Sequence, residues 1–254
     1  RAAGIDVTMA QYPYTAGSTF LHVVIPPWYH SRGVDGLLRA LREERGAIKH
    51  DLDTRMDWEN FSQSVGWEKI FVSSVVSEAN QPCVGKSISQ IAAERGHADP
   101  ADAAFDLLVE EQLAVGMISF GLDEADITAI MRHPAVSFIT DGLMSGRPHP
   151  RAYATYPRIL GRYVREQGVL SLEEAVRKMT SLPARKIRLR NKGVIAEGYD
   201  ADLVVFDPDT VIDKNSYDDP RVHPAGIAHV LVNGVFVVED AALTGARPGR
   251  VIRD

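Results

Sequence analysis

One carboxylate and several cationic side chains lie close together in the middle of the chain. A short apolar run, 136–140, leads directly into Asp141, and Arg147, His149 and Arg151 follow in a segment rich in glycine and proline. Carboxylates at strand ends beside cationic loops are the usual way in which α/β enzymes build a site. Asp141 and the glycine after it also suit a turn that closes a strand, with both arginines in solvent. The pattern alone leaves both interpretations open.

A second group of polar side chains lies near the start of the chain. Tyr12, Tyr14 and Ser18 follow a strand predicted over 5–10, and Pro13 between the tyrosines ends regular pairing. Hydroxyl groups gathered on one loop are typical of a polar pocket, although a Tyr-Pro-Tyr stretch is equally typical of ordinary packing.

Alternating strands and helices are expected to position these residues. Apolar spacing and capping residues predict helices, with a possible capping box at Ser87-Ile-Ser-Gln90 and Asp99 as the cap before Pro100. Short apolar runs rich in β-branched residues predict strands. The helices are predicted over 34–45, 87–95, 99–113, 123–132, 156–167, 171–179 and 183–189, and the strands over 5–10, 70–76, 114–120 and 135–140. Alternation at a spacing of about 20 residues favours an α/β fold with a parallel sheet or barrel.

The last part of the chain has a different pattern. Short apolar runs at 193–198, 201–207 and 229–238 are separated by turn residues. Asn233-Gly234, between two apolar runs, is the strongest short hairpin signal that a sequence can carry. These runs predict a small all-β part.

Two domains follow from this change of pattern. We predict an α/β part over 1–190 and a β part over 191–254. Within the first part, 46–86 is predicted as an insertion or lid over a site, because long excursions between regular elements are often functional. A small packed subdomain without a direct role is the alternative for this segment.

Composition and charge exclude several classes of function. A hydrophobic content of 45% and a charged content of 24% are ordinary for a globular protein, and no apolar run approaches the ~20 residues that cross a bilayer. The net charge of -6 gives no attraction to nucleic acid or to an anionic membrane. The single cysteine, Cys83, excludes an internal disulfide framework and a thiolate metal cluster. We therefore expect no nucleic-acid or membrane partner and a cytoplasmic location.

The first residues suggest that the chain is part of something longer. Residues 1–8 have the pattern of a helix end, a glycine cap and a strand, without an initiator Met or a signal-peptide pattern. We expect this chain to be the later part of a longer protein.

Several stretches together resemble the D-aminoacylase family, the N-acyl-D-amino-acid deacylases of the amidohydrolase superfamily. The similar stretches are Tyr12-Pro-Tyr-Thr-Ala-Gly-Ser-Thr19, Thr140-Asp-Gly142, Arg147-Pro-His-Pro-Arg-Ala-Tyr153, Pro157-Arg-Ile-Leu-Gly-Arg-Tyr163, Leu172-Glu-Glu-Ala-Val-Arg-Lys-Met-Thr180, Gly198-Tyr-Asp-Ala-Asp-Leu-Val-Val-Phe-Asp207 and Thr244-Gly-Ala-Arg-Pro-Gly-Arg250. The run 201–207 alone is similar to amidohydrolases in general, and the block from 140 to 151 narrows the resemblance to this family.

The resemblance implies the later part of a metal-dependent (β/α)8 TIM-type barrel with a small C-terminal β-sandwich, in which 136–140 forms the eighth barrel strand. It also implies one or two zinc ions, held by His and Cys residues expected before residue 1, with Asp141 as a further ligand. None of the eight histidines forms the His-x-His pair that opens an amidohydrolase barrel, and Ala10 stands where family members commonly have an acidic residue. We therefore expect the first half of the barrel, or a partner chain, to be required. The oligomeric state, including a homo-oligomer, stays open.

The activity implied by the resemblance is the hydrolysis of N-acyl-D-amino acids to a carboxylate and a D-amino acid. Asp141 matches the family's general base, and Arg151 matches the arginine that binds the α-carboxylate of the substrate. Further candidates for substrate binding are Tyr12, Tyr14, Ser18 and His149, of which His149 also suits a structural role because prolines flank it.

Two alternatives remain open. A cyclic amidase similar to dihydroorotase or hydantoinase would use the same strand-end aspartate, although the Arg151 loop favours a linear substrate with a free carboxylate. The second alternative is a catalytically incomplete fragment or subunit that needs another chain for its metal ligands.

Overall fold

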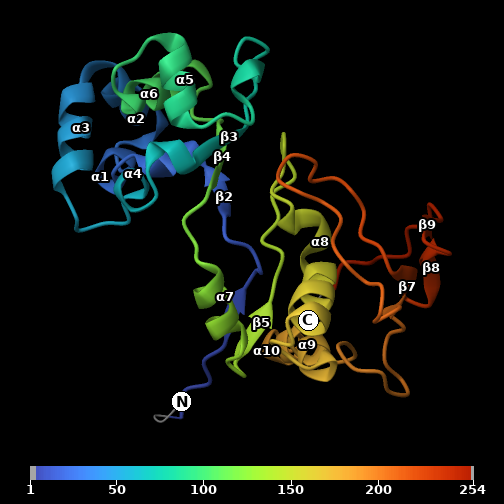
Figure 1. The fold of residues 1–254 in the computed structure, drawn as a ribbon. Helices are drawn as coiled ribbons and strands as arrows, with labels where there is room; N and C mark the ends of the chain where they lie inside the picture. The colour runs from blue at the N-terminus through green and yellow to red at the C-terminus, as the bar shows by residue number, and fades with distance from the viewer. Residues whose placement is uncertain (1–3, 253–254) are drawn as a thin grey trace. The chain divides into compact units, whose positions relative to one another are not determined.

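The computed structural model describes residues 4–252, which form two compact units (Figure 1). Unit 1 contains 4–13, 125–141 and 150–252, and unit 2 contains 14–124 and 142–149. Each unit is therefore built from separate stretches of the chain.

A short parallel pair of strands organises unit 1. β1 (Met9–Gln11) runs parallel to β5 (Val136–Phe138), with Met9 opposite Val136. The amide of Met9 donates to the carbonyl of Ala135 at 3.0 Å. Both strands are shorter than predicted, since 5–8 and 139–140 lie outside them, and the pair is parallel, as expected for a parallel sheet or barrel. Val136 and Phe138 are buried, which anchors β5 in the core of the unit.

Helices from the second half of the chain pack beside this pair. They are α7 (Glu124–Met131), α8 (Arg151–Arg158), the π-helical segment η4 (Ile159–Glu166), α9 (Leu172–Met179) and α10 (Ser181–Lys186). α7, η4 and α9 share a core with β5, and it contains Ile127, Met131, Val136, Phe138, Ile159, Leu160, Tyr163, Ala175 and Val211. The helix predicted from 156 instead begins at Arg151. Pro157 disfavours helix in the residue before it, and Ala154 breaks from helical geometry (φ -140°, ψ 21°).

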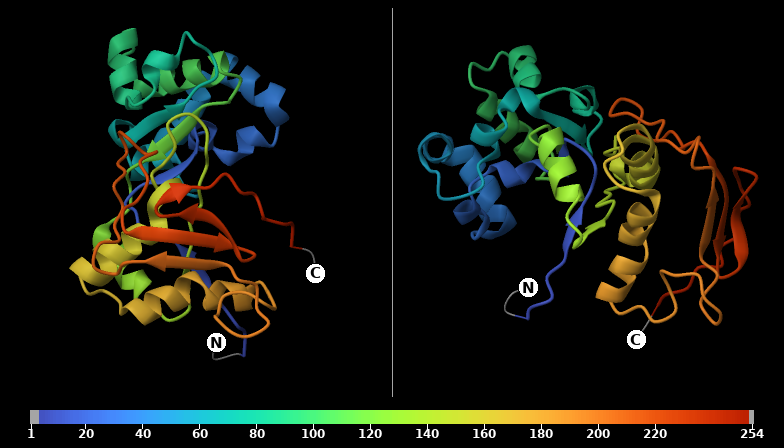
Figure 2. Two further views of the ribbon diagram at one scale, coloured as in Figure 1. Left: turned by 90° about the vertical axis from the view of Figure 1, so that its right-hand side faces the viewer. Right: turned by 60° about the horizontal axis from the view of Figure 1, so that its bottom comes forward.

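Unit 1 ends in a four-stranded antiparallel sheet, which Figure 2 shows from two sides. Its strands, in spatial order, are β6 (Leu203–Phe206), β7 (Ile227–Val232), β8 (Val235–Glu239) and β9 (Ala242–Leu243). The predicted Asn233-Gly234 hairpin turn is confirmed, since both residues have positive φ (48° and 78°). The strand predicted over 193–198 is wrong: Gly193 and Gly198 both adopt positive φ, and these residues, all described, form turns.

Unit 2 contains a second, antiparallel sheet. β4 (Gly116–Ser119) lies between β2 (Gly17–Phe20) and β3 (Ile70–Ser74) and is antiparallel to both. The strand predicted over 114–120 is therefore present, but its predicted membership of a parallel sheet is wrong. The alternation of strands and helices gives only the order of elements along the chain. It does not determine which strands pair, and β4 pairs with β2 and β3 of the same unit.

The helices of unit 2 share a buried core with β3 and β4. They are η1 (Leu21–Val24), α1 (Pro27–His30), α2 (Gly33–Glu43), α3 (Arg45–Thr54), α4 (Phe61–Ser64), η2 (Trp67–Lys69), η3 (Gln81–Cys83), α5 (Ile88–Arg95) and α6 (Pro100–Glu110). The predicted capping box of α5 is confirmed, because Ser87 and Gln90 exchange side-chain and backbone hydrogen bonds. Asp99 caps α6 through the amide of Ala101, as predicted. The segment 46–86 lies wholly inside unit 2.

Within 4–252, no helix combines the length and the apolar character that crossing a bilayer requires.

Candidate functional site

The ends of the two parallel strands bring Tyr12 and Asp141 to one edge of unit 1. Gln11 in β1 lies opposite Phe138 in β5, and the amide of Ile139 donates to the carbonyl of Gln11 at 3.0 Å. Because parallel strands end at the same edge, the residues that follow them share one region. The strand-end placement inferred for Asp141 from its sequence is thus observed.

Arg151 connects these two strand ends. Its Nη2 lies 2.7 Å from Asp141 Oδ2, and its Nε donates to the Asp141 carbonyl at 2.8 Å. Its guanidinium carbon lies 4.4 Å from the centre of the Tyr12 ring, a cation–π distance. The structure therefore brings together three of the predicted site residues.

The two charged partners differ in their access to solvent. The side chain of Arg151 is 1% exposed, whereas that of Asp141 is 58% exposed. Arg151 is the first residue of α8, so its backbone is fixed by a helix while its guanidinium is enclosed. More than half of the Asp141 side chain is therefore open to solvent in the described structure.

Asp141 also has an unusual backbone. Its φ is 46°, in the left-handed region that costs a non-glycine residue roughly 1–2 kcal/mol, although Asp and Asn tolerate it better than most. Strain of this kind is typical of residues held in place for a function. The hydrogen bond from Arg151 to the Asp141 carbonyl helps to hold this conformation.

The surroundings of Tyr12 change the pKa of its phenol. Burial raises the pKa of the Tyr12 phenol above its ordinary value, and the positive charge of Arg151 partly opposes this rise. Tyr12 therefore stays protonated at neutral pH.

Tyr14, Ser18 and His149 belong to unit 2. The His149 ring is 1% exposed, its Nε2 lies 3.0 Å from the carbonyl of Ala16, and it meets the Tyr14 ring edge-on at 5.0 Å. This buried arrangement is what the structural alternative for His149 predicts. Ser18 lies in β2, paired with Ile118. The substrate-binding roles of these three residues remain predictions.

The loop after Asp141, 142–149, belongs to unit 2 and contacts β3 of the same unit. The amide of Arg147 donates to the Ser73 carbonyl at 2.8 Å, where β3 shifts register between Val72 and Ser74. Gly146 has a φ of 53°, and a Cβ there would lie 2.6 Å from the Ser73 carbonyl oxygen. Sequence patterns did not identify Ser73 as a partner, and the glycine at 146 was the only local signal.

The contacts of Arg158, like those of Ser73, were not predicted from the sequence. Its Nε donates to the Pro13 carbonyl at 2.9 Å, and its Nη1 lies 2.8 Å from Asp213 Oδ2. Arg158 thereby fixes the turn that follows Tyr12. The only available signal was its place in the family-like stretch that begins at Pro157.

The described residues supply too few ligands for a metal ion. Among residues 4–252 no group of three or more His, Cys, Asp or Glu side chains is arranged to hold a metal ion. Asp141 offers one oxygen ligand, and its carboxylate is paired with Arg151. The described residues do not form a zinc site by themselves.

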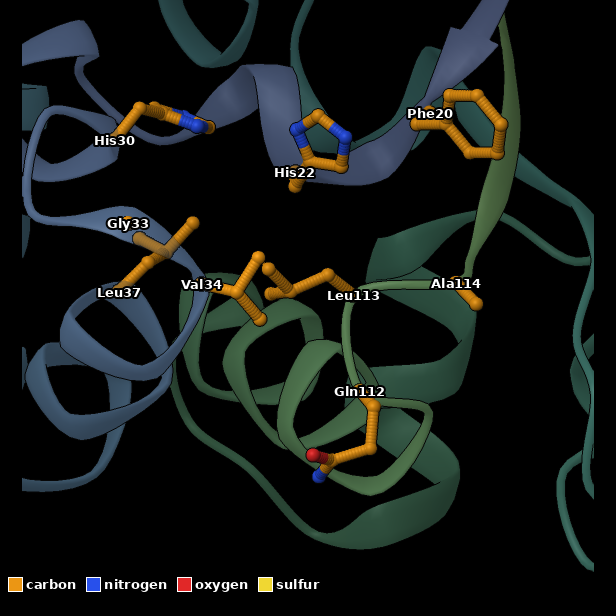
Figure 3. A pocket seen from close by; sticks show the side chains of 9 residues that line it. All are labelled: Phe20, His22, His30, Gly33, Val34, Leu37, Gln112, Leu113 and Ala114. Carbon is orange, nitrogen blue, oxygen red and sulfur yellow. The ribbon is translucent and has the colours of Figure 1, made fainter.

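A pocket of about 400 Å³ lies elsewhere, within unit 2 (Figure 3). The residues that line it are Phe20, His22, His30, Gly33, Val34, Leu37, Gln112, Leu113 and Ala114. Burial lowers the pKa of His22, and the neighbouring His30 lowers it further. The pocket is lined by none of the predicted site residues and by no carboxylate, so it does not compete with the Asp141 site as a hydrolytic centre.

The family model described as the amidohydrolase family matches residues 81–238. The chain is 38% identical over 254 residues to N-acyl-D-glutamate deacylase of Alcaligenes xylosoxydans xylosoxydans, covering 100% of this chain and 42% of that protein. It is 43% identical over 169 residues to D-aminoacylase of the same organism, covering 66% of this chain and 34% of the relative. The chain thus spans less than half the length of these relatives.

A solved structure shares the fold over the whole chain. The crystal structure of N-acyl-D-glutamate deacylase from Bordetella bronchiseptica, complexed with zinc and a phosphonate inhibitor that mimics the tetrahedral intermediate, gives a TM-score of 0.76 at 34% identity. The match covers 100% of this chain and 44% of that one.

Proposed function

The chain belongs to the amidohydrolase family, and on that basis we propose that it forms the later part of a zinc-dependent N-acyl-D-amino-acid deacylase. The observation that carries this proposal is the Tyr12–Arg151–Asp141 group at the ends of two parallel strands. The 38% sequence identity to an N-acyl-D-glutamate deacylase, which extends over the entire chain, supports the choice of reaction.

The architecture that we propose is the end of a (β/α)8 barrel followed by a portion of a β-sandwich. The parallel pair β1–β5 suits two neighbouring barrel strands, and β6–β9 suit one sheet of a sandwich. Ile5, Val7 and Met9 are between 41% and 64% exposed, which is unusual for apolar side chains around a barrel strand. Further strands from the region that the relatives possess would cover them.

Asp141 is proposed as the general base and acid. It accepts a proton from the attacking water as the water oxygen bonds to the amide carbon. When the carbon–nitrogen bond breaks, the same carboxyl group returns the proton to the departing amine. The products are a carboxylate and a D-amino acid, and Asp141 ends as it began.

Zinc, held chiefly by ligands outside the described residues, would lower the pKa of a bound water toward ~7 and polarise the amide carbonyl. The task of this chain is to deliver and orient Asp141 at the strand end. Arg151 is the family's candidate for binding the substrate α-carboxylate through paired hydrogen bonds.

An assay of the complete protein that contains this chain tests the proposal. We expect hydrolysis of N-acetyl-D-glutamate, N-acetyl-D-aspartate or a neutral N-acetyl-D-amino acid, with little turnover of the L-enantiomers. Chelation should abolish the activity and zinc should restore it. Turnover of hydantoin or dihydroorotate instead would replace the proposal with the cyclic-amidase alternative.

A further inference from the structure

The pocket in unit 2 is lined by none of the residues of the proposed reaction, and we propose that it binds a small uncharged molecule with an apolar body and one acceptor oxygen (Figure 3). Its volume of about 400 Å³ lies within the range of sites that hold small molecules. All of its lining residues belong to the stretch 14–124, so a single unit builds the pocket. The inference goes beyond the proposed function and does not rest on it.

Apolar side chains form most of the pocket wall. Leu37 is buried, whereas Phe20 and Val34 are 44% and 61% exposed. Apolar and aromatic side chains around a concave surface are typical of small-molecule sites. A ligand with an apolar body would remove the exposed parts of Phe20 and Val34 from water, which favours binding.

The lack of charged groups in the wall favours an uncharged ligand. Among the described residues that line the pocket, none is Lys, Arg, Asp or Glu. Burial lowers the pKa of His22, and the nearby His30 lowers it further, so the His22 ring is neutral at neutral pH. A charged ligand would lose its hydration here without gaining an ionic partner.

His22 supplies the polar contact. Figure 3 shows its ring between those of Phe20 and His30, whose centres lie 5.8 Å and 5.4 Å away. The Nδ1 of His22 is buried and has no hydrogen-bond partner among the described residues. Because a buried N–H without an acceptor is costly, we assign the proton of the neutral ring to Nε2. The Nε2–H group is then the donor that is left for an oxygen of the ligand.

Hydrogen bonds within the chain form this pocket in advance. Nε2 of His30 donates to the Ile25 carbonyl at 3.1 Å, which fixes that imidazole. Gln112 and Leu113 have positive φ (50° and 70°), a conformation that is costly for non-glycine residues and is often found at functional sites. The amide of Leu113 donates to the Leu108 carbonyl at 2.8 Å, which holds this part of the wall. A pocket formed in advance needs little rearrangement to bind a ligand.

The experiment compares three probes of similar shape: acetophenone, its hydrocarbon isostere α-methylstyrene, and benzoate. Each probe is titrated into the complete protein that contains this chain, and Kd is measured from the NMR signals of methyl groups. We expect the methyl signals of Leu37 and Leu113 to shift, because both residues line the pocket.

Acetophenone should bind the wild type with a Kd below about 1 mM. It should bind at least about fivefold more tightly than α-methylstyrene, which lacks the acceptor oxygen, and at least about tenfold more tightly than benzoate, which is charged. Equal affinity for acetophenone and α-methylstyrene, or tighter binding of benzoate, would overturn the proposed ligand class. If none of the three probes bound the complete protein, the site itself would be overturned.

Substitutions at His22 test the polar contact. His22→Gln keeps an N–H group near the position of Nε2, whereas His22→Leu removes it. The preference for acetophenone over α-methylstyrene should persist in His22→Gln and disappear in His22→Leu. A preference that survived in His22→Leu would contradict the role of His22.

Val34→Phe adds bulk to the pocket wall and should weaken the binding of acetophenone at least about tenfold. Val76→Phe is the matched control, because Val76 is also exposed (75%) and belongs to unit 2 but does not line the pocket. Unchanged affinity in Val34→Phe would mean that the probe binds elsewhere, which would refute the proposal. All of these outcomes are read from binding, so a failure of the proposed deacylase activity would leave them fully decisive.

Discussion

Glu111 and Asp141 are two carboxylates with different surroundings, and we propose a chemical role for Asp141 alone. Glu111 is 4% exposed and accepts hydrogen bonds from the amides of Val76 and Ser77, the Ser77 hydroxyl and the Asn80 amide group. Asp141 is exposed and has Arg151 as its cationic partner. A buried carboxylate whose oxygens accept several hydrogen bonds, such as that of Glu111, holds a loop in place. An exposed carboxylate with fewer hydrogen-bond partners can exchange a proton with a substrate, which is the role that we propose for Asp141.

Replacing Asp141 tests its proposed role as the base. Asp141→Asn removes the proton acceptor, and asparagine tolerates the left-handed backbone at this position. We expect kcat to fall by about 10²–10⁴-fold while the circular dichroism spectrum stays unchanged. Activity within a few-fold of the wild type would remove Asp141 from the mechanism.

Glu111 should make stability depend on pH. Burial alone would raise its pKa, but the hydrogen bonds from Ser77, Asn80 and Val76 lower it from 4.5 to about 2. The folded-state pKa lies below the unfolded one, so the stabilisation, at most about 3 kcal/mol, is complete above the unfolded pKa of 4.5 and is lost as the pH falls toward 2.

Urea unfolding of wild type and Glu111→Gln measures this contribution. The difference in unfolding free energy should be largest near neutral pH and should shrink as the pH falls below 4.5. Glu94→Gln serves as the control, because Glu94 is exposed and pairs at the surface with Lys86. A difference that stays constant from about pH 7 to about pH 3 would show that the charge of Glu111 is unimportant.

At the scale of elements, the irregular part of β3 shapes the loop that follows Asp141. The register shift next to Ser73 leaves its carbonyl to accept from Arg147, and Gly146 packs against Ser73 and Ser74. Bulges often redirect a backbone in this way beside functional sites. The loop 142–149 therefore depends on β3, within the same unit, for its conformation.

Gly146→Ala should disturb this packing. The new Cβ would meet the Ser73 carbonyl oxygen and Ser74 in addition to the strain of a positive φ. Gly198→Ala is the matched control, because Gly198 also has a positive φ (79°) but a Cβ added there would meet nothing within 4 Å. Thermal unfolding should show a loss of about 1 kcal/mol for the control and at least about 1 kcal/mol more for Gly146→Ala. An equal loss of unfolding free energy in both variants would mean that the loop accommodates the added Cβ without destabilising the fold.

Short sequence patterns predicted helix caps and turns better than they predicted contacts between distant segments. Capping at Ser87 and Asp99 and the Asn233-Gly234 turn depend on neighbouring residues, and all three are observed. The antiparallel pairing of β4 and the grip of Arg151 on Asp141 depend on contacts that no short stretch contains. The family resemblance predicted Arg151 and Asp141 as site residues, but periodicity and propensity carry no information about which donor meets which acceptor.

At the scale of the whole molecule, the proposed reaction needs more metal ligands than the described residues bring together. Residues 4–252 hold no group of three or more metal-binding side chains, and the chain corresponds to 42% of the N-acyl-D-glutamate deacylase to which it is similar from end to end. The proposed reaction therefore depends on groups that we expect in the part of the deacylase outside this region.

Metal analysis of the 254-residue chain tests this dependence. Because a zinc site needs three or four protein ligands, we expect less than about 0.1 zinc ion per chain after dialysis and no deacylase activity. Both should appear when the chain is produced together with the part of the deacylase that it does not match. Stoichiometric zinc in the chain alone would contradict the assignment of the ligands to that other part.

The two sequence stretches of unit 2 have a consequence for recombination between related genes. A crossover that exchanged 14–124 alone would leave Gly146 and Arg147 facing a foreign β3, whose register and serines need not match them. Viable chimaeras should therefore inherit 142–149 from the same parent as 14–124. The two stretches would then behave as one heritable block, although 125–141 of unit 1 runs between them in the gene.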